Sequence, residues 1–280
     1  MSVRPAAVAG TWYPGTRGAL AREVDGFVAA VPDAPALDVR AIIAPHAGIM
    51  FSGPVAAYAY KAAAAASPYD VIALVGPSHF DAFEGVALYP GGAFDSPLGL
   101  AQIDGAGVAA LAESPIVRKH KGPHDREHSL EMQIPFLRRL LPDVPIVPML
   151  MGFQRRQTIL DLAAGLTTAF KNRRTLLVAS TDLSHYFDAE TAAAYDGRVS
   201  ERVAAFDPEG LLDLFEEYPE HERGRYVACG GGPAIAVMLA SRAMGATTAR
   251  VLKYAHSGEV SGDYGAVVGY LAAAMGSPVS

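Results

Sequence analysis

The chain has 280 residues, a formal net charge of −6 at pH 7 and a single cysteine. This acidic balance excludes a general attraction to nucleic acid or to anionic membranes, because both require positive potential. One cysteine cannot form an intramolecular disulfide, which fits a reducing compartment. We therefore expect a cytoplasmic protein that has neither nucleic acid nor a membrane as a partner.

The N-terminal segment and the most alanine-rich stretch are the two places where a targeting or membrane segment could lie. Pro5, Trp12 and Pro14 interrupt the N-terminal apolar residues, so no signal-peptide core is predicted. The stretch 56–66 is too short to cross a bilayer and contains Lys61. We expect no transmembrane helix.

Apolar runs of strand length alternate along the chain with longer segments of helical spacing. Strands are predicted at 39–44, 71–76, 85–89, 145–150, 175–180, 249–254 and 265–272. Helical patterns occupy 129–141, 155–170, 189–206 and 231–245, and an earlier helical face runs through Leu20, Val24, Phe27 and Val31. Pro135 is expected to kink or delay the helix in which it lies. This alternation is typical of α/β proteins with a largely parallel sheet.

The runs at 71–76 and 175–180 are apolar throughout, as strands covered on both faces are. We therefore place both in the centre of the sheet. No linker, charged run or repeat divides the chain. The prediction is one domain over residues 1–280, an α/β fold with a central, mostly parallel sheet flanked by helices.

A histidine follows three of the predicted strands closely: His46 in IIAPHAG, His79 in ALVGPSHF and His185 in VASTDLSHY. Ligands of open α/β sheets bind beyond the carboxyl ends of the strands, so the three side chains should converge on one edge. One histidine in such a place is more often a turn or hydrogen-bonding residue than a ligand. Three of them together favour a functional site.

The cysteine, Cys229, lies in the segment ACGGGP, followed by three glycines and Pro233. Proline suits the first turn of a helix, which places the thiol just before the N-terminus of the helix at 231–245. The helix dipole and free amide groups there favour the thiolate, and the glycines would let an ion or substrate approach the backbone. A packed thiol is an equally good interpretation of this position.

Two histidines and a thiolate can bind a transition metal and leave one coordination position open. Zinc accepts such sets in catalytic sites, copper accepts imidazole with thiolate, and Fe(II) usually takes two histidines and a carboxylate. These residues therefore leave the metal undetermined. Asp182, three residues before His185, can orient an imidazole or add a carboxylate. A turn or helix-cap role is the alternative for Asp182.

The segment HDREHSLEMQIPF contains a second polar cluster, with His124, Asp125, Glu127, His128 and Glu131. His128 and Glu131 are one helical turn apart, but the pair is not repeated elsewhere, as a helix-bundle metal site requires. A substrate contact by His128 at the rim of the site, or a hydrogen-bonded helix start, accounts for the cluster more simply. The sequence has neither a G-x-S-x-G elbow nor a phosphate-binding loop.

Six segments, in this order, resemble the Memo family: AGTWYPG, APHAGIMFSG, VGPSHF, DREHSLEMQIPFL, STDLSHY and ACGGGP. The resemblance covers residues 9–272. Within the family, the chain resembles the type called protein B of prokaryotic AmmeMemoRadiSam systems. It implies a fold related to the class III extradiol dioxygenases. It also implies radical-SAM and Ammecr-type proteins as partners.

The resemblance implies that His46, His79 and Cys229 occupy the metal-binding positions. Asp182 and His185 match the remaining polar positions, and His185 falls where the related dioxygenases place a catalytic acid/base. The resemblance thus gives these last two residues catalytic roles. It also implies Fe(II) or copper as the metal, with zinc as a further option.

Three other aromatic or imidazole residues enter through the same comparison. We expect Trp12 and Tyr13 to line the cleft, and an N-terminal aromatic anchor packed on the domain is the alternative interpretation of both. His256 stands where the family more often has an amide residue, and its role is left open.

Two functions remain open on the sequence. The first is a metal-dependent oxidoreductase, similar to an extradiol dioxygenase, that acts on an unidentified small molecule, an aromatic compound being one option. The second is a non-catalytic metal-binding or partner-binding scaffold that uses the same cleft. Extradiol dioxygenases have a glutamate where this chain has Cys229, and an oxidisable thiolate changes the metal preference. A thiol hydrolase that pairs Cys229 with His185 is a third, less favoured reading.

Overall fold

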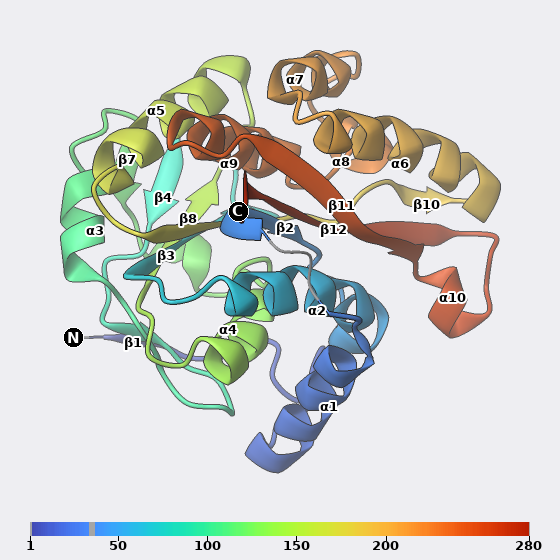
Figure 1. The fold of residues 1–280 in the computed structure, drawn as a ribbon, viewed down its shortest axis with the longest axis horizontal. Coiled ribbons are helices and arrows are strands. Elements are labelled where there is room, and N and C mark those ends of the chain that lie inside the picture. The colour runs from blue at the N-terminus through green and yellow to red at the C-terminus, as the bar shows by residue number, and fades with distance from the viewer. Residues whose placement is uncertain (1, 34–36, 280) are drawn as a thin grey trace.

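The computed structural model describes residues 2–33 and 37–279, and it places one large sheet between two layers of helices (Figure 1). The strands of this sheet lie in the order β10 (His185–Phe187), β12 (Val267–Pro278), β2 (Leu37–Ala44), β9 (Thr175–Ser180), β3 (Val71–Pro77), β8 (Ile146–Met151), β4 (Val86–Leu88) and β7 (Val117–Lys119), while β11 (Thr248–His256) pairs with β12. A small second sheet joins β1 (Val3–Arg4), β5 (Ala93–Phe94) and β6 (Ala101–Gln102).

The four central strands β2, β9, β3 and β8 pair in parallel. Antiparallel pairing joins β12 to β2, to β10 and to β11, and also joins β4 to β8, so the complete sheet is mixed. The predicted α/β class with a central sheet flanked by helices is confirmed. The mostly parallel arrangement holds at its centre, where β3 and β9 are buried along their whole length, as predicted.

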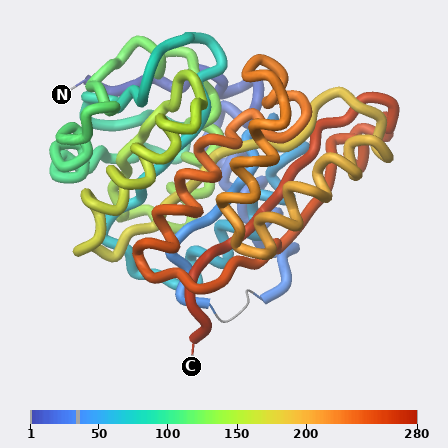
Figure 2. Tube along the Cα trace, turned by 90° about the horizontal axis from the view of Figure 1, so that it is seen from above, coloured from blue at the N-terminus to red at the C-terminus, as the bar shows by residue number. Residues whose placement is uncertain are grey.

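Helices cover both faces of the sheet (Figure 1). One layer contains α5 (Arg156–Phe170), α6 (Ala189–Ala204), α7 (Pro208–Glu216) and α9 (Gly231–Ala243), and the other contains α1 (Arg17–Ala30), α2 (Ile49–Ala65) and α4 (Ile134–Leu140). Across the first face α5 packs against α9, α9 against α7, and α7 against α6 (Figure 2). The short helices are α3 (Gly105–Leu111), α8 (Arg223–Tyr226) and α10 (Gly258–Ser261).

Alternate residues of the central strands contribute to two separate apolar clusters. In β3, Val71, Ala73 and Val75 pack with α5 and α9, whereas Ile72 and Leu74 pack on the side of α2 and α4. This follows from the two-residue period of a strand, which sends successive side chains to opposite faces. Apolar packing on both faces therefore fixes the register of the strands whose carboxyl ends carry the predicted site residues.

The helices agree with the sequence patterns in part. Leu20 and Val24 are buried in α1, and Pro135 lies in the first turn of α4, which begins at Ile134 after a 3₁₀ turn over Glu131–Gln133. Helix α2 was not predicted, because it is apolar or small on nearly every side and shows no helical period. Among the described residues, no helix has the length and apolar character needed to cross a bilayer.

A buried ion pair fastens the N-terminal segment to the rest of the protein. Arg4 is fully buried; its guanidinium pairs with the Glu131 carboxylate and donates to the carbonyl oxygens of Glu127 and, at 2.7 Å, His124. The same carboxylate accepts from the Tyr13 hydroxyl at 2.6 Å. Removing one partner of such a pair leaves an uncompensated buried charge.

We predict that Arg4→Ala lowers the free energy of unfolding by about 3–5 kcal/mol, because Glu131 then loses its counter-charge in the interior. The matched control is Arg242→Ala, which breaks the surface ion pair between Arg242 and Glu209. The side chains of these two residues are 41% and 59% exposed. That loss should stay below about 1 kcal/mol. Urea unfolding followed by circular dichroism measures both, and equal losses in the two variants would contradict the prediction.

Candidate functional site

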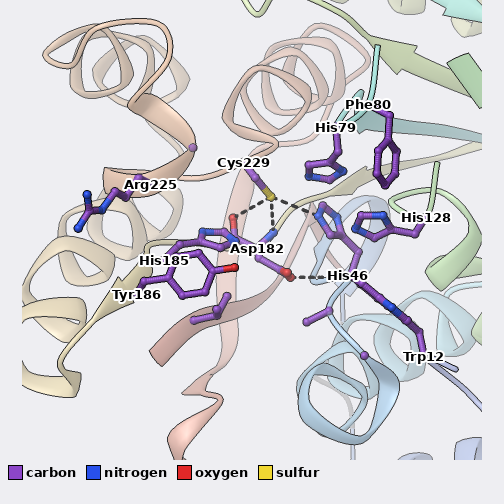
Figure 3. Close-up of a pocket in the computed structure, with 14 residues that line it drawn as sticks. Trp12, His46, His79, Phe80, His128, Asp182, His185, Tyr186, Arg225 and Cys229 are labelled. Atoms are coloured by element: carbon purple, nitrogen blue, oxygen red, sulfur yellow. Dashed lines mark hydrogen bonds between the residues drawn. The ribbon is translucent and has the colours of Figure 1, made fainter. Parts of the chain in front are cut away.

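A cavity of about 560 Å³ lies at the carboxyl edge of the parallel strands, and Figure 3 shows the residues that line it. Seven of the eight site residues predicted from the sequence line this cavity: Trp12, His46, His79, His128, Asp182, His185 and Cys229. The eighth, Tyr13, does not. The structure therefore gathers in one place residues that are distributed over most of the chain.

The strand ends deliver these side chains to the cavity. His46 follows β2 by two residues, His79 follows β3 by two, and Asp182 follows β9 by two. Cys229 arrives from the other direction, two residues before α9. Since β2, β9 and β3 are parallel neighbours, their carboxyl ends meet at one edge, as the sequence analysis expected.

Three donor atoms come close enough together to share one metal ion. Cys229 Sγ lies 3.2 Å from His46 Nε2, and the ligand atoms of His46, His79 and Cys229 all lie within 4.8 Å of one another. Imidazole nitrogen and thiolate sulfur bind transition metals at about 2.0 and 2.3 Å, so donors this close can surround a single ion. The set thus fits a transition metal by both its chemistry and its spacing.

Glu127 holds His79 from behind. Its carboxylate accepts from the His79 backbone N–H at 2.6 Å and pairs with the ring Nδ1 at 2.9 Å. Burial disfavours the charged forms of both groups. Hydrogen bonds outweigh burial, however: those with Cys229 and Glu127 raise the pKa of His79 to about 10, and those from His79 and Ser129 lower the pKa of Glu127 to about 2. Ionised Glu127 keeps a proton on Nδ1, so a metal ion would replace the proton on Nε2.

Glu127 is a functional candidate whose role the sequence analysis missed. The residue was noted only as one member of a polar cluster, and its partner His79 lies 48 positions away in the chain. No local spacing relates the two. The available signal was the presence of an acidic residue next to an otherwise buried segment, since a buried carboxylate needs a partner.

Asp182 organises the backbone of the site rather than an imidazole ring. Its Oδ1 accepts from the His46 backbone N–H at 2.7 Å, and burial raises the pKa of Asp182. Its own backbone N–H donates to Cys229 Sγ at 3.3 Å, while Cys229 N–H donates to the Asp182 carbonyl at 3.2 Å. These contacts, rather than a hydrogen bond to a histidine ring, hold His46 and Cys229 side by side.

The glycines after Cys229 serve close packing. A Cβ atom at Gly230 would collide with the Ser180 carbonyl, one at Gly231 with the Phe215 ring, and one at Gly232 would lie 2.8 Å from Met151 Sδ. These partners belong to the protein core, so the glycines let the start of α9 press against the sheet. The expectation that they open the backbone to an ion or substrate was wrong.

His185 lines the cavity beside the ligand cluster, and burial is the main cause of its lowered pKa. The preceding residue, Ser184, donates its backbone N–H to the buried Asp196 carboxylate at 2.9 Å. The following residue, Tyr186, has a φ of 64°, which is uncommon outside glycine, and this conformation leaves its ring exposed at the cavity. Among the described residues no hydrogen bond joins Cys229 to His185, so the pair required for a thiol hydrolase is not formed.

His128 lines the cavity as part of an aromatic stack. Its ring stacks on His79 with centroids 4.7 Å apart and planes 11° apart, and the Trp12 ring lies 4.3 Å from it. Burial lowers the pKa of His128 to about 4, which keeps the ring neutral at pH 7. The ring lines the cavity, where a substrate contact by His128 stays a prediction.

Tyr13, His124 and His256 lie outside the cavity. Tyr13 is buried with its hydroxyl on Glu131, so for this residue the alternative of an N-terminal anchor is correct. His124 is buried too, with Nε2 3.1 Å from the Ala87 carbonyl, and burial lowers its pKa to about 3. The ring of His256 contacts Tyr264 edge to face.

Comparisons with known proteins identify the family from sequence and find a solved structure with a similar fold. The family described as "Memo-like protein" matches residues 4–274. A MEMO1 family protein of Methanopyrus kandleri is 35% identical over 96% of this chain and 97% of its own length. Another, from Methanothermobacter thermautotrophicus, is 35% identical over 96% and 98%. The crystal structure of an uncharacterized protein from Escherichia coli K12 has a similar fold, with a TM-score of 0.57 and 14% identity over 84% of this chain and 99% of that one.

We predict that His124 makes the protein less stable as the pH falls from 6.5 toward 3. The folded pKa of about 3 lies below the ordinary histidine pKa of 6.5, so the unfolded chain takes up a proton over this range while the folded protein does not. The slope contributed is at most about 1.4 kcal/mol per pH unit. His124→Gln, which retains a donor for Ala87, should lack this contribution.

Urea unfolding at a series of pH values measures that slope. His221→Gln, at an exposed position, controls for the loss of a histidine from the surface. The prediction fails if the wild type and His124→Gln have parallel stability curves between pH 6.5 and 4.

Proposed function

Because the chain belongs to the Memo-like family, we propose that it is a metal-binding oxidoreductase of the extradiol dioxygenase kind, acting on a small-molecule substrate. The observation that carries the proposal is the convergence of His46, His79 and Cys229 donor atoms within 4.8 Å, at the edge of the sheet where α/β proteins bind ligands. These three residues would hold the metal. The family resemblance favours Fe(II) or copper, with zinc as a further option, and imidazole and thiolate donors accept copper or zinc.

A bound transition metal would supply Lewis acidity and redox chemistry at this point. The residues around it have separate tasks. His185, neutral at pH 7 because burial lowers its pKa, can accept a proton from a substrate hydroxyl in the cavity. Trp12, Phe80 and Tyr186 supply aromatic walls for a planar substrate and exclude water from its faces.

A second candidate function, binding without turnover, is favoured by the same aromatic side chains. Trp12, Phe80 and Tyr186 are 39%, 45% and 69% exposed, and large exposed apolar groups around a cavity are typical of contact surfaces for another protein. In this case the site would hold a metal as a scaffold, with radical-SAM and Ammecr-type proteins as the partners to examine. The thiolate ligand is compatible with either function.

We predict that His185→Ala lowers substrate-dependent oxygen uptake by about 10²–10⁴, because a positioned acid/base group contributes that much to the rate. Metal content should be unchanged, since His185 is not one of the three proposed ligands. Oxygen consumption with a panel of catechols, on protein loaded anaerobically with Fe(II), provides the measurement. His120→Ala, at an exposed position outside the cavity, is the control.

The outcomes of that assay test the role of His185 and also separate the two functions. Full activity in His185→Ala would refute the role given to this residue. Tight copper binding with no oxygen uptake on any catechol would favour the scaffold, whereas stoichiometric Fe(II) with uptake would exclude it.

We also predict that Cys229→Ser weakens metal binding by more than about tenfold, since even changes behind the ligands cost 10- to 100-fold in affinity. Titration with Co(II) in competition with a chelator gives the affinity, and the thiolate-to-metal absorption band reports the sulfur directly. The band should be present in the wild type and absent in the variant. Unchanged affinity with no such band in the wild type would remove Cys229 from the ligand set.

A further inference from the structure

Ser180, the last residue of β9, is buried behind His46 and has three polar neighbours. Its Oγ lies 2.8 Å from His46 Nδ1, 2.8 Å from Gln133 Nε2 and 2.6 Å from the carbonyl oxygen of Ser129. A hydroxyl carries one proton and two lone pairs, so all three contacts are satisfied in one arrangement only. The carbonyl can only accept, and it therefore takes the hydroxyl proton.

The orientation of Gln133 follows by the same reasoning. Its Nε2 donates to the carbonyl oxygen of Pro45 at 3.0 Å as well as to Ser180 Oγ, and its Oε1 accepts from the Tyr60 hydroxyl at 2.7 Å. Turning the amide over would set its oxygen against the Pro45 carbonyl, where two acceptors would face each other. Both lone pairs of Ser180 thus receive N–H donors, one from Gln133 and one from His46.

We propose that Gln133 and Ser180 are positioning residues that keep the proton of His46 on Nδ1, so that the Nε2 lone pair faces Cys229 and the cavity. This rests on the proposed function, in which Nε2 is a metal ligand. Neutral imidazole has two tautomers, and the tautomer with hydrogen on Nε2 cannot ligate through that atom. The hydrogen-bond partner of Nδ1 therefore decides whether the site is ready for a metal.

Burial supports a positioning role over a merely structural one. Tyr60, Gln133 and Ser180 are each fully buried, and the Tyr60 ring stacks on Phe136 with centroids 5.1 Å apart in an apolar layer between α2 and α4. Burying an amide and two hydroxyls has a desolvation cost that an apolar side chain of equal volume avoids. These three side chains form a complete, directional chain of hydrogen bonds that ends on a ligand nitrogen. This positioning role accounts for the desolvation cost.

One short segment then determines the tautomers of both proposed histidine ligands. Glu127 holds the proton of His79 on Nδ1, and Ser129 and Gln133 orient the hydroxyl that holds the proton of His46 on Nδ1. Residues 127–133 thus lie behind both rings. Of the polar cluster seen in the sequence, Glu127 alone has this positioning role, and Ser129 and Gln133 share it.

The test is the tautomer of His46 in the metal-free protein. Long-range ¹H–¹⁵N NMR spectra distinguish a ring protonated on Nδ1 from one protonated on Nε2, and no activity is needed. The wild type should have His46 protonated on Nδ1. In Ser180→Ala the acceptor is lost, and a substantial population with the proton on Nε2 should appear.

Metal affinity gives the second readout, by Co(II) titration against a chelator. Ser180→Ala should bind 10- to 100-fold more weakly than the wild type, the usual effect of removing a group behind a ligand. Ser241→Ala is the matched control, because Ser241 is an equally buried serine whose hydroxyl donates only to the Met238 carbonyl in α9. It should retain the wild-type affinity.

Three outcomes would overturn the proposal. They are a wild-type His46 protonated on Nε2, a Ser180→Ala variant with an unchanged tautomer, and equal affinities in Ser180→Ala and Ser241→Ala. If Ser180→Ala does not fold, Gln133→Met tests the same chain of hydrogen bonds from its other end. Failure of the wild type to bind any metal, with His46 protonated on Nδ1, would count against the proposed function and not against the tautomer.

Discussion

The Glu127 carboxylate is buried at the carboxyl end of β3, and it accepts hydrogen bonds from four N–H groups. They belong to the His79 ring, the His79 backbone and the backbones of His128 and Ser129. A buried carboxylate must be satisfied locally, so these bonds draw the turn at 127–129 against the strand end. The backbone turn places the His128 ring against His79 and the Ser129 carbonyl against the Ser180 hydroxyl. The placement of His79, of His128 and of the Ser129 carbonyl therefore depends on this one group being ionised and fully paired.

The parts of the fold that follow from local patterns were predictable. Strands β3 and β9 are continuous apolar runs, and His46 and His79 follow their strands by two residues, so the edge on which they meet could be inferred. Helix α2 could not, since its apolar residues surround the whole helix. The direction of β12 beside β2 depends on how the chain returns to the sheet, and no local pattern encodes this.

The predictions of individual roles were less accurate because partners lie far apart in the sequence. For Asp182 an imidazole contact, a further carboxylate ligand and a turn or cap role were all open, and its carboxylate accepts from the backbone N–H of His46, 136 positions earlier. Tyr13 was placed at the cleft beside Trp12, yet adjacent residues of this segment face opposite ways, one toward the cavity and one toward Glu131. The glycines after Cys229 were interpreted as open space, and only the packed neighbours reveal their purpose. The type of a residue suggests which chemistry it can perform, whereas its hydrogen-bonding partner is known only from the tertiary contacts.

Cys229 and His46 are separated by 183 positions, although their side chains lie 3.2 Å apart. In the unfolded chain the closure of so long a loop opposes any joint capture of an ion, so the three donors form a site only after the central strands have paired. Any affinity for a metal would then belong to the native state. By mass action, each tenfold rise in free metal above the dissociation constant would add about 1.4 kcal/mol to the stability of the fold. An ion bound here would therefore stabilise the folded state by joining the first and last thirds of the polypeptide.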